Sequence, residues 1–271
     1  MSNPDLSAIL AGVERICVQA GEAINRIYAD AEGIEIDRKA DDSPLTQADL
    51  ASHEVIKAGL AELAPEIPVL SEEGRAMGYE ERRDWKRFFL VDPLDGTKEF
   101  IKRNGEFTVN VALVEDGVPI LGVVHSSILG RTYSAIQGQG AWRQDSDGER
   151  RPIRAAGSGD EELVVVASRS HAGEELTAFL GHMPPHRLSS MGSSLKLCLV
   201  AEGAADIYPR IGPTMEWDTG AAHAVVLGAG GQVLNLEGQP LTYNKENLLN
   251  PYFIVVGERS VPWREAWAKV A

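Results

Sequence analysis

Two carboxylates and a threonine follow a buried-looking apolar run in the segment 88–97. The run Phe88–Val91 is long enough for a buried strand and ends at Asp92, and a proline and a glycine then turn the chain. The turn folds Asp95 and Thr97 back toward Asp92, and two acids held so close repel each other unless a cation lies between them. The segment therefore predicts a cation site. A plain surface turn is the alternative, although such a turn needs neither two acids nor a buried strand before it.

Two further acids stand at the ends of predicted elements. Glu72 follows the short apolar strand 68–70, and Asp218 precedes a helix of small residues. Taken alone, Glu72 belongs to a solvated acidic pair and Asp218 caps its helix. Beside the first cluster both become candidate metal ligands, because Mg²⁺ prefers a few carboxylates and other oxygen donors. The predicted set is Glu72, Asp92, Leu94 through its carbonyl, Asp95 and Asp218. Zinc fits less well, since neither a cysteine cluster nor a closely spaced histidine pair accompanies the acids.

Asp49 has two interpretations. Thr46 and Asp49 have the spacing of a helix capping box, which explains both residues structurally. In the functional alternative, Asp49 partners Thr97 in activating a water molecule. The spacing alone leaves both open.

Composition excludes several classes of protein. A formal charge of -14 argues against a nucleic-acid polymer as partner. An acidic protein that binds an anionic substrate needs local positive charge, which divalent cations supply. Cys17 and Cys198 are expected to be small buried hydrophobes, because each lies in a segment with helical apolar spacing. Alanine stands six residues after each, where a cysteine-dependent phosphatase needs arginine, so that mechanism is excluded. The sequence shows neither a secretion signal nor an apolar stretch of about 18 residues, so we expect a cytoplasmic protein.

Apolar periodicity and turn residues predict the elements that must position these side chains. Helices are expected at 4–28, 47–63, 174–180, 195–201 and 219–227, and strands at 68–70, 88–91, 107–114, 118–125, 131–136, 163–167, 205–208 and 252–256. The pattern predicts an α+β region, 1–155, with most of the metal ligands, and an α/β region, 156–271, with Asp218 and the substrate-binding residues. The boundary falls in the polar stretch 144–160.

Four motifs occur in a characteristic order along nearly the whole chain. They are Ser43-Pro44 with Thr46 and Asp49, Glu72-Glu73, Asp92-Pro93-Leu94-Asp95-Gly96-Thr97, and Trp217-Asp218. Together they resemble the inositol monophosphatase superfamily. The resemblance implies a lithium-sensitive, magnesium-dependent phosphatase with a layered αβαβα sandwich. It also implies two or three Mg²⁺ ions bridged by Asp92, with Glu72 and the Leu94 carbonyl on one ion and Asp95 and Asp218 on another. Thr97, with Asp49 or Glu72, would orient or deprotonate the attacking water.

Three further segments indicate a branch of that superfamily. Residues 98–101, 104–108 and 192–196 look like those of the bacterial 3'(2'),5'-bisphosphate nucleotidases. This implies hydrolysis of adenosine 3',5'-bisphosphate, a by-product of sulfate assimilation, to AMP and phosphate. Ser193, Lys196 and Arg210 are candidates for the second phosphate, and His171 for the adenine or ribose. The implied contacts to the reacting phosphate come from Glu72, Leu94, Asp95, Gly96, Thr97 and Asp218.

Other readings remain open at this point. Inositol phosphates, histidinol phosphate and fructose bisphosphate are alternative substrates, and a non-catalytic metal-binding scaffold is an alternative function. The family usually has its glycine later than Gly220, so packing at that point is expected to differ. The sequence predicts neither an oligomeric state nor whether the protein attaches loosely to the inner membrane.

Overall fold

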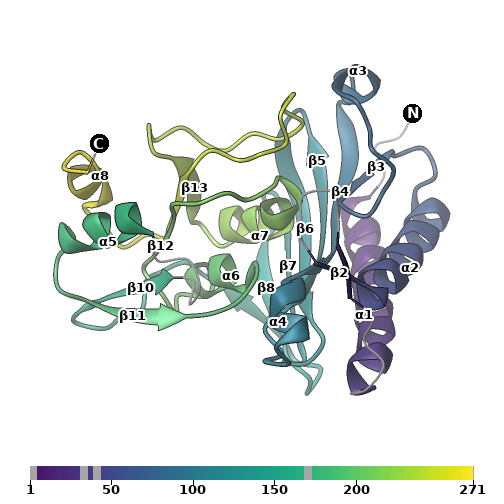
Figure 1. Ribbon diagram of the computed structural model, residues 1–271, viewed down its shortest axis with the longest axis horizontal. Coiled ribbons are helices and arrows are strands. Elements are labelled where there is room, and N and C mark those ends of the chain that lie inside the picture. The colour runs from purple at the N-terminus through teal and green to yellow at the C-terminus, as the bar shows by residue number, and fades with distance from the viewer. Residues whose placement is uncertain (1–4, 31–35, 39–43, 168–172, 271) are drawn as a thin grey trace.

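The computed structural model describes residues 5–30, 36–38, 44–167 and 173–270. Two sequence-predicted positions, Ser43 and His171, lie outside these ranges. Two large sheets organise the chain, and helices cover and separate them (Figure 1).

The larger sheet has seven strands in the order β3-β4-β5-β6-β7-β8-β9. Its first pair is parallel and the other neighbours are antiparallel. The strands are β3 (Val69–Ser71), β4 (Arg87–Asp95), β5 (Thr108–Glu115), β6 (Val118–Ser126), β7 (Arg131–Ile136), β8 (Gly140–Gln144) and β9 (Arg150–Ile153). A separate small pair consists of β1 (Ile36–Arg38) and β2 (Pro44–Thr46).

The smaller sheet has five strands in the order β11-β10-β12-β14-β13, with both parallel and antiparallel neighbours. Its members are β10 (Leu163–Ala167), β11 (His186–Ser190), β12 (Ile207–Arg210), β13 (Gln232–Asn235) and β14 (Phe253–Val256). The helices are α1 (Leu6–Ala29), α2 (Gln47–Leu63), α3 (Tyr79–Arg82), α4 (Thr97–Ile101), α5 (Glu174–Gly181), α6 (Leu195–Ala201), α7 (Trp217–Gly228) and α8 (Trp263–Trp267).

Alternation along β4 shows how the layers form. Phe89 and Val91 pack with α1 and α2 on one face, whereas Phe88 and Leu90 pack with α6 and α7 on the other. The second face of the central helices meets the five-stranded sheet, whose outer face α5 and α8 cover. The order is therefore helices, sheet, helices, sheet, helices. The expected layered αβαβα sandwich is confirmed.

The central helix α7 packs unusually close to the seven-stranded sheet. A Cβ atom built on Gly122 of β6 would lie 2.2 Å from the Ala221 carbonyl oxygen, and one built on Gly220 would lie 2.8 Å from Leu90 Cδ2. Larger side chains at these two positions would push the helix off the sheet. Gly220, noted above as a departure from the family pattern, thus has a packing reason in this chain.

Several sequence predictions need correction. The last predicted helix begins at Trp217 rather than Thr219, and Glu216 occupies its N-cap position. The strand expected at 205–208 spans Ile207–Arg210. The sequence did not predict β8, β11, β13 or β9, the last of which lies inside the polar stretch 144–160. Cys17 and Cys198 are buried as expected, and burial raises the pKa of both thiols.

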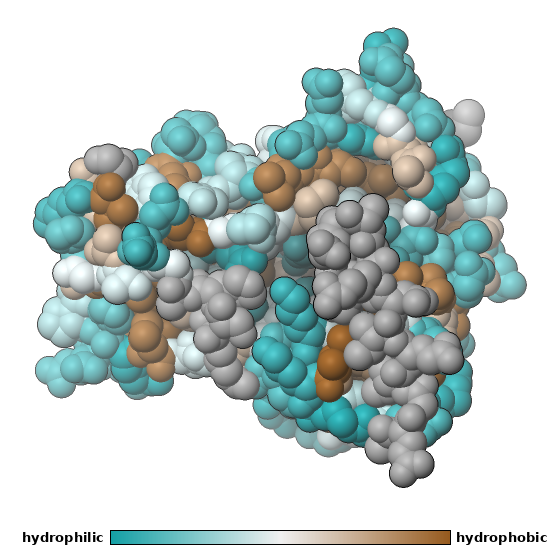
Figure 2. Space-filling model, in the orientation of Figure 1, coloured by the Kyte–Doolittle hydropathy of each residue, from teal (hydrophilic) through white to brown (hydrophobic). Residues whose placement is uncertain are grey.

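The visible surface of the molecule is mostly polar. On the face in Figure 2, hydrophilic side chains predominate and the apolar ones form separate patches. Among the described helices, none combines the length and apolarity that a membrane crossing requires.

The division at residue 155 stays a prediction. Helix α7, from the second half of the sequence, contacts β4 to β8 of the larger sheet as well as β13.

Candidate active site

Asp49 links the start of α2 to Thr97. Its Oδ2 accepts hydrogen bonds from the Thr46 backbone N–H at 2.8 Å and from the Thr46 hydroxyl at 2.6 Å, and the capping box is complete. Its Oδ1 accepts a hydrogen bond from the Thr97 hydroxyl at 3.1 Å. A carboxylate has two oxygens, so the structural and functional interpretations of Asp49 are compatible. The capping box is confirmed, and a part in water activation stays a prediction.

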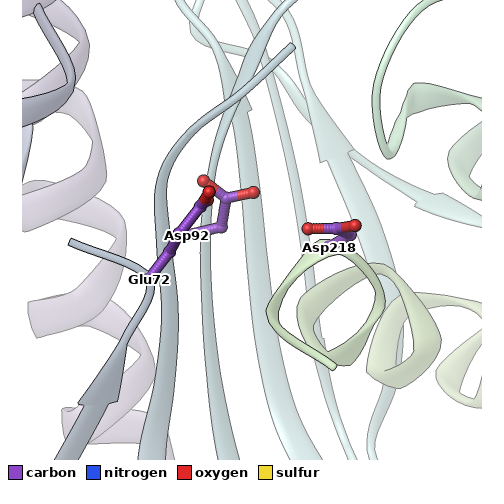
Figure 3. A group of neighbouring side chains, drawn as sticks. All are labelled: Glu72, Asp92 and Asp218. Carbon is purple, nitrogen blue, oxygen red and sulfur yellow. The ribbon is translucent and has the colours of Figure 1, made fainter. Parts of the chain in front are cut away.

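Three acids from elements far apart in the sequence converge at one point. Glu72, Asp92 and Asp218 each offer an oxygen within 4.8 Å of the others. Glu72 follows β3, which runs parallel to β4, and the Glu72 N–H donates to the Val91 carbonyl at 3.1 Å, so Glu72 lies next to Asp92. Asp218 faces them from the first turn of α7 (Figure 3). Two predicted strand ends and one helix start thus meet at one point.

The electrostatics of this cluster call for a cation. Asp92 is only 1% exposed, and burial, followed by the charges of Glu72, Asp95 and Asp218, raises its pKa well above the usual value. Burial also raises the pKa of Asp218, with further contributions from Asp95 and Glu72, while a hydrogen bond from the Met215 N–H opposes the shift. A cation between the acids would remove this penalty. The all-oxygen donor set suits Mg²⁺, so the residues present fit the metal that the resemblance implies.

Asp218 lies at the start of α7 and binds the segment that precedes the helix. It lies inside the first turn, where its Oδ2 accepts a hydrogen bond from the Met215 N–H at 2.9 Å. Asp218 is not the N-cap residue, because Glu216 holds that position. The role of Asp218 as a metal ligand stays a prediction.

Asp95 is not one of the three acids whose oxygens lie within 4.8 Å of one another, although its charge acts on both Asp92 and Asp218. Its Oδ2 accepts a hydrogen bond from the Ser194 N–H at 2.5 Å. Burial raises its pKa to about 6, although the Lys196 charge and the Ser194 N–H oppose that shift. Asp95 and the Leu94 carbonyl therefore stay predictions as metal ligands. A bulge between Asp92 and Asp95 interrupts the β4–β5 pairing at this point.

The predicted second-phosphate residues line one cavity of about 260 Å³, together with Asp95 and Asp218. Lys196 is buried; its Nζ donates to the Ser193 carbonyl at 2.6 Å and lies 5.6 Å from the centre of the Tyr208 ring. The Arg210 guanidinium donates to the Pro213 carbonyl at 2.7 Å, while its buried Nε has no hydrogen-bond partner within the described part of the chain. Gly96, at φ +97°, precedes α4 at the same end of β4.

The sequence did not predict two hydrogen bonds that join remote segments around these residues. Ser52, in α2, donates to the Pro93 carbonyl at 2.6 Å, and Glu106 accepts from the Gly192 N–H at 2.8 Å. Glu106 and Gly192 lie in two of the segments that suggested the nucleotidase branch, and the structure brings those segments together. Helical spacing from Asp49 could have pointed to Ser52, whereas no spacing rule connects Glu106 with Gly192.

Comparison with known proteins decides the family. A family model described as the inositol monophosphatase family matches residues 5–256. The chain belongs to the inositol monophosphatase family.

Several relatives in this family are very similar. The 3'(2'),5'-bisphosphate nucleotidase CysQ of Escherichia coli strain K12 is 50% identical over 248 residues, which cover 91% of this chain and 99% of that protein. A crystal structure of CysQ from Bacteroides thetaiotaomicron superposes with a TM-score of 0.85 at 42% identity, covering 95% of this chain and all of that one. An inositol monophosphatase from Anabaena (Nostoc) sp. PCC 7120, at 24% identity and a TM-score of 0.76, shares the fold, with 98% of this chain and 97% of that chain covered. Family membership and fold are confirmed, and the family comprises metal-dependent phosphatases.

Proposed function

We propose that this chain is a magnesium-dependent phosphatase that removes the 3'-phosphate of adenosine 3',5'-bisphosphate, giving AMP and phosphate. One observation carries the proposal: Lys196 and Arg210 line the same cavity as Asp218 of the acidic cluster. A substrate with two phosphates needs two regions of positive charge. Metal at the acidic cluster would serve the reacting phosphate, and the two side chains would serve the other. The 50% identity to CysQ nucleotidases supports the same substrate.

The acidic cluster would hold the metal. Glu72, Asp92 and Asp218 supply converging oxygens, and Asp95 and the Leu94 carbonyl are the further proposed ligands. Bound Mg²⁺ supplies positive charge that offsets the phosphate and the departing oxygen and acidifies a nearby water. Two or three ions are proposed, and Asp92 would be among the residues that hold them.

Thr97 and Asp49 would position the attacking water. The Thr97 hydroxyl donates a hydrogen bond to Asp49 Oδ1 at 3.1 Å, with the Leu94 carbonyl at 3.4 Å as a second acceptor. Its oxygen can therefore accept a hydrogen bond from water. Asp49 is 1% exposed and is held by Thr46, so its Oδ1 is kept in place as the nearer acceptor for the Thr97 hydroxyl. Glu72 is the alternative group for water activation. No covalent enzyme intermediate is required.

The second phosphate would lie against Ser193, Lys196 and Arg210. Hydrogen bonds from charged donors contribute about 1.5 to 3 kcal/mol each, which is enough to separate a bisphosphate from a monophosphate. His171, proposed for the adenine or ribose, lies outside the described residues. We propose that the enzyme is cytoplasmic.

The test compares kcat/KM for adenosine 3',5'-bisphosphate and inositol 1-phosphate with Mg²⁺, with and without Li⁺. We expect preference for the bisphosphate and inhibition by Li⁺. The K196A and R210A variants should raise KM for the bisphosphate about tenfold or more and leave KM for inositol 1-phosphate, which has a single phosphate, nearly unchanged. K57A, at an exposed lysine of α2, should change neither.

Other outcomes would contradict the proposal. Preference for inositol 1-phosphate would favour the inositol monophosphatase activity instead, and equal effects of K196A on both substrates would remove Lys196 from the second-phosphate site. No turnover of any phosphomonoester after Mg²⁺ is restored would favour a non-catalytic scaffold.

A further inference from the structure

A polar stripe on α2 faces the candidate active site. Asp49, Ser52 and His53 lie at helical spacing on one face, and all three are buried. Asp49 contacts Thr97, and His53 Nδ1 lies 3.0 Å from the Ser71 hydroxyl, directly before Glu72. Ser52 contacts the turn after Asp92. One helix therefore contacts the segments that carry three of the proposed functional residues.

Ser52 is an unusual helix residue. A serine in a helix interior commonly bonds its own backbone three or four residues back, and serine is a poorer helix former than alanine. The Ser52 side chain is 0% exposed and donates instead to the Pro93 carbonyl, 41 residues away, at 2.6 Å. The stability of α2 does not explain this residue, and the contact with Pro93 does.

One peptide unit links the Pro93 carbonyl to the Asp92 carboxylate. This carbonyl and the Leu94 N–H belong to one planar peptide unit, and the Leu94 N–H donates to Asp92 Oδ1 at 3.0 Å. The unit lies at the bulge where pairing between β4 and β5 is interrupted, so the sheet does not fix its plane. Hydrogen bonds to Ser52 on one side and to Asp92 on the other fix the plane of this peptide unit. Hydrogen bonds arranged in such a chain also polarise and strengthen one another.

We propose that Ser52 is a positioning residue which, through the Pro93–Leu94 peptide, orients the Asp92 carboxylate and sets the affinity of the site for divalent metal. The proposal rests on the metal site of the proposed function. Partners that orient metal ligands typically contribute about tenfold to hundredfold to metal affinity.

Ser126 provides a matched control. It is also 0% exposed, and across the ranges that the structure describes no group hydrogen-bonds its hydroxyl. The S126A variant removes the same atom from a buried site without touching the Asp92 turn. The S52T variant keeps the hydroxyl and tests for rescue.

The experiment titrates metal-free protein with Mn²⁺ and follows free Mn²⁺ by electron paramagnetic resonance, without substrate. We expect S52A to bind Mn²⁺ about tenfold or more weakly, S126A to bind within about twofold of the wild type, and S52T to recover most of the affinity. Urea unfolding in EDTA shows whether each variant is folded. If S52A does not fold, S52C, whose thiol is a weak donor, replaces it with the same expected weakening.

The outcomes separate the two proposals. Wild-type binding retained by folded S52A or S52C, or equal weakening in S52A and S126A, would overturn the role of Ser52 alone. Failure of the wild-type protein itself to bind Mn²⁺ would overturn the metal site on which the proposed function depends.

Discussion

Asp49 illustrates how one residue serves two purposes. The same carboxylate completes a capping box with one oxygen and holds the Thr97 hydroxyl with the other. The cap fixes Asp49 on a rigid helix, and a rigid support is what a catalytic side chain needs. A structural explanation of a polar residue therefore does not argue against a functional one.

Replacing Thr97 tests the second purpose. T97A removes the hydroxyl that is proposed to orient the attacking water. We expect kcat to fall by about two to four powers of ten, as is typical when a proton-transfer group is removed. Mn²⁺ affinity should change little, because Thr97 is not among the proposed metal ligands. Steady-state kinetics and Mn²⁺ titration measure the two quantities.

T97S is the matched control for that variant. It keeps the hydroxyl and should retain most of the activity, so that the loss in T97A is assigned to the oxygen rather than to the methyl group. A kcat for T97A within about threefold of the wild type would exclude Thr97 from catalysis.

At the scale of elements, contiguous apolar runs predicted the buried strands of both sheets. Strands such as β4 and β10 have contiguous apolar side chains that both faces bury, and the sequence predicted them. The missed strands β9 and β11 are largely exposed, with few apolar side chains to alternate. Edge strands of this kind are stabilised by one neighbour and carry polar residues, so periodicity cannot find them.

The same limit applies to the site. Acids at strand ends are visible in the sequence because an apolar run precedes them, and Asp92 and Glu72 were predicted in this way. Hydrogen bonds between remote segments have no such signal. The contact of Ser52 with Pro93 spans 41 residues and that of Glu106 with Gly192 spans 86. Only the folded chain brings these pairs together.

At the scale of the molecule, the two sheets build the site jointly. Glu72 and Asp92 come from the larger sheet, Arg210 from the smaller sheet, and Asp218 from the helix between the two. The central helical layer must therefore keep its position for the proposed metal ligands and the proposed substrate residues to face each other. Its buried polar groups link the stability of the whole molecule to pH.

His223 of α7 is the group from which a pH dependence is predicted. Its Nδ1 lies 2.9 Å from the Tyr243 hydroxyl, and burial lowers its pKa from 6.5 to about 3. Below about pH 6.5 the His223 imidazole becomes protonated in the unfolded chain but stays neutral in the folded chain. This residue alone should therefore lower the free energy of unfolding by about 1.4 kcal/mol per pH unit as the pH falls from about 6 toward 4.

The H223Q variant isolates this contribution, because glutamine can still hydrogen-bond but does not titrate. Urea unfolding of both proteins in EDTA, from about pH 4.5 to 8, gives their stability difference at each pH. We expect the difference to shift in favour of H223Q below about pH 6.5 and to be constant above about pH 7.5. A difference that does not vary with pH would contradict the assignment, whatever its size.

The convergence of acids on a divalent ion is tested most directly by anomalous X-ray scattering from crystals grown with Mn²⁺ at a concentration that supports turnover. We predict at least one anomalous peak bounded by the carboxylate oxygens of Glu72, Asp92 and Asp218. Peaks only elsewhere in the molecule, or none, would contradict the account.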